Sequence, residues 1–195
     1  MNHKPIYPGA RLEACASFAR KGKVAADIGT DHAYLPIWLI QNHISRRVYA
    51  SDINEEPINV ARKNIEEYAL TEKIITFTGD GLEKVPREEV DDIIVAGMGG
   101  DNIASIIDGA KWLCNRRYRL ILQPMSHTER LREYLYSHGF LILTEKAVCE
   151  SRRLYTVICA EFSGEEFSFD EYDIYAGRLT GTDPDSAAIL KKQAG

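Results

Sequence analysis

The sequence predicts an α/β protein with a seven-stranded, mostly parallel sheet, a C-terminal antiparallel hairpin and helices on both faces. Up to residue 138, β-branched or apolar runs alternate with helical patterns, which is typical of a parallel sheet. After Gly139 two strand-like runs follow each other with no helix between them, which predicts a hairpin. A length of 195 residues with 45% hydrophobic side chains is enough for one sizeable core.

The elements are expected in a regular order. A short leading helix is predicted at 9–20, because Leu12, Cys15 and Ala19 recur at helical spacing before a Lys-Gly-Lys turn. Parallel strands are predicted at 23–28, 47–53, 73–78, 92–96 and 118–122. The helices between them are predicted at 35–43, 56–69, 101–112 and 127–138. The hairpin strands are predicted at 140–148 and 154–162.

The most informative motif follows the first strand. Residues 27–33 read Asp-Ile-Gly-Thr-Asp-His-Ala, so an acidic strand end opens a glycine turn that leads into a helix. A nucleotide-like cofactor binds at such a strand-turn-helix, and the usual fingerprint has further glycines where the backbone approaches the ligand. This chain has Asp31 and Ala33 at those places, so an Asp31-His32 pair enters the binding loop.

Acidic residues also follow the next two strands. Asp52 ends the second strand, where a carboxylate can accept hydrogen bonds from both ribose hydroxyls. Asp80 and Gly81 follow the third strand, from which an acid can meet the exocyclic amine of an adenine ring. Either acid taken alone also fits a solvated turn. Together with Asp27, they favour a nucleotide-like cofactor at one edge of the sheet.

The fourth and fifth strands end in residues that suit close approach of another molecule. Gly97-Met98-Gly99-Gly100 follows the fourth strand, and the alternative is a plain helix N-terminus capped by Asp101. The fifth strand ends at Gln123-Pro124, which brings an amide to the same edge, although a simple turn is an equal alternative. The histidines outside the first loop are expected to do no chemistry: His3, His43, His127 and His138.

Charge and cysteine spacing limit the partners. The net charge of -5 argues weakly against wholesale nucleic-acid binding, although a local basic patch can coexist with it. Basic candidates for phosphate contact are Arg46-Arg47, Arg116-Arg117-Arg119, Arg130-Arg132 and Arg152-Arg153. The four cysteines lack C-x-x-C spacing, which disfavours a zinc site and predicts buried, reduced thiols. We therefore expect no bound metal.

Nothing in the sequence predicts a membrane segment. No apolar run approaches the roughly 20 residues of a membrane helix. Residues 1–5 lack the apolar core of a signal peptide, so a cytoplasmic location is expected.

Three of these motifs together resemble the bacterial tRNA (adenine-22-N1)-methyltransferases. They are Asp27-Ile-Gly-Thr-Asp-His-Ala-Tyr-Leu-Pro36, Ala96-Gly-Met-Gly-Gly100 and Leu120-Ile-Leu-Gln-Pro124, and the resemblance covers roughly residues 10 to 180. It implies a Rossmann-like methyltransferase sheet and transfer of a methyl group from S-adenosylmethionine to N1 of adenine 22 in tRNA. The products would be 1-methyladenine and S-adenosylhomocysteine. The oligomeric state stays open.

The resemblance also implies which residues form the site. Cofactor contacts are expected from Asp27, Gly29, Thr30, Asp31, Asp52, Ile53, Asp80, Gly81, Gly97 and Met98. Substrate contacts are expected from Gly99, Gly100, Gln123 and Pro124, and catalytic roles from Asp31, His32 and Tyr34. Asp31 would accept a hydrogen bond from the adenine 6-amino group or would bind the cofactor ammonium, while Tyr34 or Met98 packs on the ring. His32 would orient Asp31 or cap the following helix.

The expected domain plan is a methyltransferase domain at 1–165 with a short N-terminal helix. The family it resembles carries a C-terminal helical hairpin, so 166–195 is expected to be the start of a truncated or absent helical appendage. Three alternatives remain. A methyltransferase of a small molecule or protein fits the acidic charge. An NAD-dependent oxidoreductase fits Asp52 but not the missing glycines or the hairpin. A scaffold that binds RNA without turnover is disfavoured by the three intact acids.

Overall fold

The computed structural model describes residues 6–194, and its sheet has the strand order β3-β2-β1-β4-β5-β7-β6. The parallel strands are β1 (Lys23–Ile28), β2 (Ser45–Asp52), β3 (Ile74–Thr78), β4 (Asp92–Met98) and β5 (Arg119–Pro124). The antiparallel strands are β6 (Phe140–Glu150) and β7 (Arg153–Phe162), and β7 pairs with β5. This order confirms the predicted Rossmann-like sheet with its terminal hairpin.

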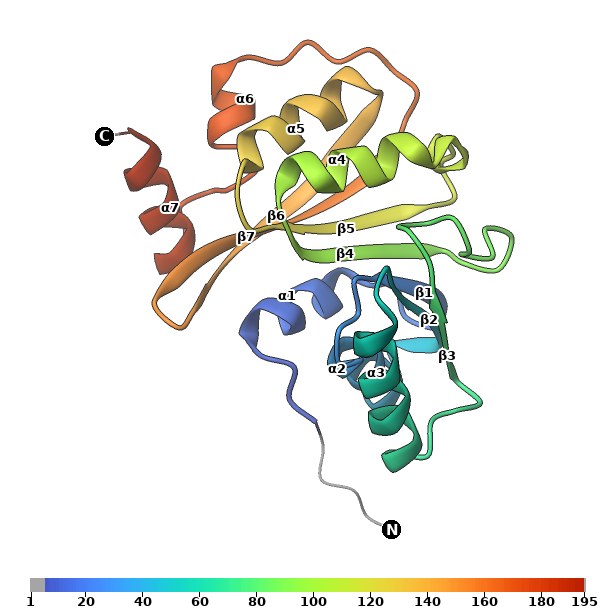
Figure 1. Ribbon diagram of the computed structural model, residues 1–195. Coiled ribbons are helices and arrows are strands. Elements are labelled where there is room, and N and C mark those ends of the chain that lie inside the picture. The colour runs from blue at the N-terminus through green and yellow to red at the C-terminus, as the bar shows by residue number, and fades with distance from the viewer. Residues whose placement is uncertain (1–5, 195) are drawn as a thin grey trace.

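Helices cover both faces of the sheet (Figure 1). One face carries α1 (Ala10–Phe18), α2 (Tyr34–Gln41) and α3 (Glu55–Glu67). The other carries α4 (Gly100–Gly109), the short turn η1 (Lys111–Leu113) and α5 (Thr128–Ser137). Side chains alternate between the two cores along each strand, as β1 illustrates: Val24 and Ala26 pack under α4 and α5, whereas Ala25 packs under α2.

The element boundaries differ from the predicted ones at the fourth strand. The strand at 23–28 coincides with β1, but β4 continues through Met98 rather than ending at residue 96. Gly97 has φ 81, and the pairing of β4 with β5 shifts register there, so that Met98 lies opposite Pro124. The glycine therefore bends the strand end toward the site edge.

The C-terminal segment contains α6 (Glu171–Tyr175) and α7 (Pro184–Ala194), and it returns to the α5 side of the sheet. A buried ion pair organises this return. Arg132 Nε donates to Glu145 Oε1 at 2.8 Å, and Arg132 Nη1 donates to the carbonyls of Ile174 and Tyr175. The backbone N–H of Arg178 donates to the other oxygen of Glu145 at 2.6 Å. Residues 174–178 are thereby fixed to α5 and β6.

The cysteine prediction is only half correct. Cys15 and Cys159 are buried, and burial raises the pKa of their thiols to about 12 and about 11. Cys114 and Cys149 are exposed, so the expectation of burial is wrong for them, and all four thiols are free. Cys149 lies near the end of the edge strand β6, at a position whose side chain is exposed.

Within residues 6–194, no helix has the length and apolar character needed to cross a bilayer. In the same range, no three His, Cys, Asp or Glu side chains are grouped so that they could hold a metal ion. The expectations for the first five residues, including the absence of a signal peptide and the idle role of His3, lie outside the described residues.

Candidate functional site

The loop after β1 is held to the neighbouring strand by its backbone. The N–H groups of Gly29 and Thr30 both donate to the carbonyl of Ser51 on β2, at 2.8 and 2.9 Å. Gly29 has φ 78, and Asp31 and Ala33 also adopt left-handed conformations, with φ 47 and 59. Such values are unusual for residues with a Cβ and are found mostly where the surrounding structure imposes them. The reversal is sharp enough to start α2 at residue 34.

Three side chains predicted to be catalytic lie together at the mouth of this loop. His32 Nδ1 lies 2.8 Å from Asp31 Oδ2, and the His32 ring stacks on the ring of Tyr34 with 5.3 Å between centroids. Asn64 of α3 donates to the His32 carbonyl at 2.8 Å and fixes the backbone. The residue that precedes α2 is Ala33, and this helix end has no side-chain cap. His32 therefore contacts Asp31 and does not cap the helix.

Asp27 lies beneath the loop and is 5% exposed. Burial raises the pKa of its carboxyl to about 6, and the negative charge of Asp52 adds to the rise. Asp52 is half-buried at the end of β2, where its Oδ1 accepts a hydrogen bond from the Asn54 N–H at 2.9 Å. Asp80 and Ile53 are exposed. The three acids follow three successive strands in the sheet, β1, β2 and β3, as predicted.

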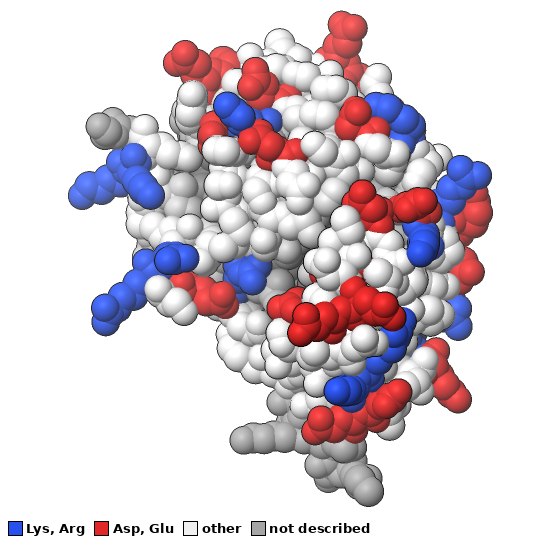
Figure 2. Space-filling view, viewed as in Figure 1, with Lys and Arg blue, Asp and Glu red and all other residues white. Residues whose placement is uncertain are grey.

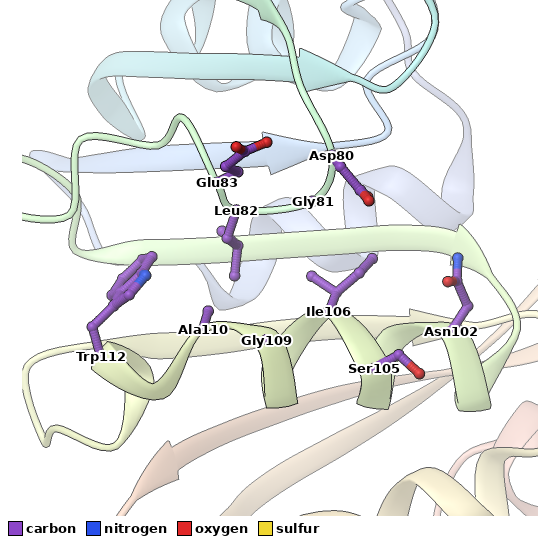
Figure 3. A pocket seen from close by; sticks show the side chains of 10 residues that line it. All are labelled: Asp80, Gly81, Leu82, Glu83, Asn102, Ser105, Ile106, Gly109, Ala110 and Trp112. Carbon is purple, nitrogen blue, oxygen red and sulfur yellow. The ribbon is translucent and has the colours of Figure 1, made fainter.

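Two cavities open at this edge. One, of about 340 Å³, is lined by Pro8, Arg11, Leu12, Asp27, Gly29, Thr30, Asp31, His32, Tyr34, Leu35, Ala96 and Gly97. The other, of about 550 Å³, lies between the loop after β3 and α4. Figure 3 shows Asp80 and Asn102 at one end of it, Leu82 and Ile106 pointing toward each other across it, and Trp112 at its far end.

Met98 lies between the two cavities. Its terminal methyl group lies at the position that a Cβ on Gly29 would occupy, so a larger residue there would displace this methyl group as well as strain the backbone at φ 78. Its sulfur accepts a hydrogen bond from Asn102 Nδ2 at 3.4 Å. An elongated ligand that reached from Asp27 to Asp80 would therefore pass along the Met98 side chain.

Arg11 of α1 is a site residue that the sequence analysis missed. Its Nη1 donates to Gln123 Oε1 at 2.5 Å, and its guanidinium lies 5.9 Å from the centre of the Tyr155 ring. The backbone N–H of Arg11 donates to Glu150 Oε1 at 3.1 Å, which anchors the helix start to the end of β6. No motif marks Arg11, because its position depends on residues more than a hundred places away in the chain.

Gln123 does not face the cavity, which differs from its predicted role in substrate contact. It is fully buried, and its Oε1 accepts from Arg11 and from the Gly97 N–H, the latter at 3.1 Å. Its Nε2 donates to the Pro124 carbonyl at 2.8 Å, and Pro124 is itself buried. The amide therefore positions Arg11 and the bend at Gly97.

The remaining glycines serve helix packing. Gly99 precedes α4, and Gly100 donates its N–H to the Ser126 carbonyl at 2.8 Å. A Cβ on Gly100 would collide with the His127 carbonyl, so glycine is required for α4 to approach the start of α5. Gly100 is buried, which does not fit the predicted substrate contact.

Asp101 is not a helix cap. Its side chain pairs with His127 Nδ1 at 2.7 Å and with Arg130 Nη1 at 3.1 Å, and α4 has no side-chain cap. The alternative of a simple Asp101-capped helix N-terminus is therefore wrong. His127 takes part in this exposed charged cluster at the surface between α4 and α5.

Comparisons with known proteins agree with this geometry. Residues 9–158 match the family model described as a methyltransferase domain. The chain is 36% identical over 185 residues to the tRNA (adenine(22)-N(1))-methyltransferase of Bacillus subtilis, covering 93% of this chain and 78% of that protein.

Two solved structures bear on the cofactor. A Streptococcus pneumoniae protein in complex with S-adenosyl-L-methionine is 33% identical, with a TM-score of 0.87 over 94% of this chain and 86% of that chain. TrmK of M. capricolum in complex with S-adenosyl-homocysteine is 26% identical, with a TM-score of 0.75 over 94% of this chain and 93% of that chain.

Proposed function

Because the chain belongs to the tRNA (adenine(22)-N(1))-methyltransferase family, we propose that its acceptor is N1 of adenine 22 in tRNA. The protein is an S-adenosylmethionine-dependent methyltransferase. The observation that carries the choice of acceptor is the Asp31–His32 pair, held 2.8 Å apart at the mouth of the cavity that contains Asp27 and Arg11. A cytoplasmic location and tRNA as partner belong to the same proposal.

The cofactor contacts follow from the charges along the edge. The carboxylate of Asp52 accepts the ribose hydroxyls, and Asp80 meets the adenine amine. The amino-acid end of the cofactor enters the cavity of about 340 Å³, with its ammonium toward Asp27. Among the lining residues in the described part of the chain, Arg11 is the one Lys or Arg side chain, so we assign it to the cofactor carboxylate.

The main contribution of the protein to this reaction is to position the methyl donor and the acceptor base. S-adenosylmethionine supplies an activated methyl group, and N1 of neutral adenine offers an in-plane lone pair, so no proton has to be removed first. N1 is hidden while the base is stacked or paired, and the base must therefore be captured outside the stack. Asp31 accepts a hydrogen bond from the 6-amino group, which raises electron density at N1 and favours the cationic product. His32 positions Asp31, and Tyr34 packs on the captured ring.

The proposed catalytic domain spans 1–165, which includes the matched residues 9–158. The segment from residue 166 is proposed as the start of a helical appendage. Its α6 end is fixed by the buried Arg132–Glu145 pair.

The direct test is methyl transfer from labelled S-adenosylmethionine to an unmodified tRNA transcript with adenine at position 22. A matched transcript with guanine there is the control. Label in the adenine transcript alone is the expected result. Label in neither transcript, while the cofactor still binds, would refute the proposed acceptor and would favour a small-molecule or protein substrate.

A further inference from the structure

A third cavity, of about 250 Å³, lies beside the proposed methyl-transfer site. It is bounded by the end of β5, the start of β7 and the outer part of α7. Its lining residues are Pro124, Met125, Thr128, Leu154, Tyr155, Thr156, Ile189, Lys192 and Gln193. We call it the β7–α7 pocket. Its volume is smaller than the 300–1,000 Å³ typical of pockets for whole cofactors or drug-sized ligands, so it suits a small planar group.

The β7–α7 pocket and the cavity around Asp31 share a wall. Tyr155 lines the former and Arg11 the latter, and the guanidinium of Arg11 lies over the Tyr155 ring. The backbone gives a second link, because Met125 donates its N–H to the Met98 carbonyl at 2.8 Å. A polymer that placed one unit in the first cavity would therefore pass directly over the second.

The β7–α7 pocket combines accessible apolar side chains with polar ones, among them Thr128, Thr156 and Gln193. Met125 is 43% exposed and Leu154 is 36% exposed, although both are large hydrophobic side chains. The Tyr155 ring adds an aromatic surface. Apolar and aromatic side chains around a small opening are what a stacked nucleobase requires, and such stacking tolerates any base.

The rim of the pocket is positively charged in a protein whose net charge is -5. Lys192 lines it and Lys191 precedes it on α7, while Arg152 lies in the turn between β6 and β7 and Arg153 is the first residue of β7. Figure 2 shows basic side chains projecting over α7 and this turn. Among residues 6–194, neither arginine side chain has an ion-pair partner.

The acids nearest the rim are already engaged. Glu150 pairs with Arg11 at 3.6 Å, and Asp185 accepts a hydrogen bond from the Cys149 N–H at 2.9 Å. Within residues 6–194 neither acid forms an ion pair with a cation of the rim, so these cations remain available for phosphate groups.

We infer that the β7–α7 pocket receives the unstacked base of the nucleotide next to the target adenine, with its phosphate on the Lys192 and Arg153 side. This inference rests on the proposed RNA substrate. Extruding a base from a stack leaves its neighbour without a stacking partner, and a second pocket offsets that loss. Holding two consecutive nucleotides would also fix the orientation of the first.

The test combines pocket variants with modified substrates. Leu154→Ala and Met125→Ala each remove part of the apolar wall. Leu143→Ala is the matched control, because Leu143 is a similarly exposed leucine of the same hairpin, 42% exposed, that does not line the pocket. Each protein is assayed with intact tRNA transcript and with transcripts that are abasic at position 21 or at position 23.

With intact tRNA, the two pocket variants are expected to raise KM for tRNA about five- to tenfold and to leave the dissociation constant for S-adenosylmethionine unchanged. With the unsubstituted protein, one of the two abasic transcripts should show a similar rise in KM. The same abasic transcript should raise KM little further in the pocket variants, since these variants already lack the contact between the base and the pocket. Leu143→Ala should behave as the unsubstituted protein does in every assay.

Additive losses in the variants and the abasic transcripts would overturn the inference, and so would an unchanged KM in both pocket variants. These outcomes are separable from failure of the proposed function. If the unsubstituted protein does not methylate the intact adenine-22 transcript, the proposed acceptor is wrong and the pocket inference falls with it. If it does, the comparison of the pocket variants with the abasic transcripts decides whether the β7–α7 pocket holds the neighbouring base.

Discussion

Asp27 combines a structural cost with its proposed role in cofactor binding. Its pKa lies at about 6 instead of the ordinary 3.8, mainly because the carboxyl is buried. That difference corresponds to about 3 kcal/mol against the ionised form at neutral pH when no cation is present. The positive charges of S-adenosylmethionine would supply the missing partner. A binding residue that destabilises the ligand-free fold is typical of functional sites.

Asp27→Asn is therefore expected to raise the free energy of unfolding of the ligand-free protein at pH 7 by about 2 to 3 kcal/mol. It should also weaken S-adenosylmethionine binding at least tenfold. Urea unfolding and cofactor titration measure the two effects. A variant that lost stability, or that bound the cofactor normally, would show that Asp27 is only a satisfied core carboxylate.

The same carboxyl sets a pH dependence. Because the folded pKa of Asp27 is raised, the stabilising contribution of its protonated form is fully present below about pH 4 and is lost as the pH rises through about 6. Cofactor binding should run in the opposite direction, with affinity falling below about pH 6 as the carboxylate is neutralised. Titrations between pH 5 and 8 test this, and Asp27→Asn should flatten the profile.

Asp31→Ala separates the two roles open to that residue. Asp31 is more exposed than Asp27 and lies at the mouth of the cavity. We therefore expect turnover to fall by about a hundredfold with little change in cofactor affinity. Single-turnover rates and cofactor titration measure this. A parallel loss of cofactor affinity would assign Asp31 to the cofactor ammonium instead. His32→Ala should reproduce part of the loss in rate, since it removes only the positioning contact.

Among the elements, the Arg132–Glu145 pair is a buried polar attachment of the segment after β7. Both side chains are fully buried, and Arg132 also binds two carbonyls near the end of α6. Arg132→Met would leave Glu145 buried without a cation, which typically costs 3–5 kcal/mol. We expect a destabilisation of about that size in urea unfolding, with faster proteolysis near residues 174–178.

Arg130→Met is the control for this prediction. Arg130 lies two positions away on α5 and pairs with Asp101 at the surface, where such pairs contribute at most about 1 kcal/mol. The double variant Arg132→Met with Glu145→Leu should recover part of the lost stability, because no charge is then left unpaired. Equal stability of Arg132→Met and Arg130→Met would contradict the proposed attachment.

An element could be predicted from the sequence where the interactions that define it are local in the chain. The strands of the parallel sheet and the acids at their ends could be predicted, since each depends on a local pattern of apolar residues and a turn. Arg11 could not, because its place in the site arises from contacts with Gln123, Tyr155 and Glu150. Arg132 was grouped with surface cations because its partner Glu145 lies on another element, 13 positions later, among exposed residues of β6.

At the scale of the whole molecule, the distribution of charge indicates where the proposed tRNA substrate would bind. The chain is acidic overall, but the four basic groups predicted from sequence differ sharply in the structure. Arg116, Arg117 and Arg119 pair with Glu165, Asp91 and Glu161, and Arg132 is buried. Arg152 and Arg153 stand at the turn that extends beyond the carboxyl end of β5. The basic surface nearest the proposed site is thus the hairpin turn with α7.

Affinity for tRNA should therefore depend steeply on salt, whereas cofactor affinity should change little. The double variant Arg152→Gln with Arg153→Gln should reduce the slope of log affinity against log salt by about 1 to 2, because two phosphate contacts are removed. Arg46→Gln with Arg47→Gln is the control for position, since this pair lies near the start of β2 at the opposite edge of the sheet, where Arg47 pairs with Glu89. Filter-binding titrations over a range of salt concentrations give the slopes. If both double variants changed the slope equally, the positive charges would attract RNA without orienting it. The prediction that RNA binds at the hairpin turn would then be wrong.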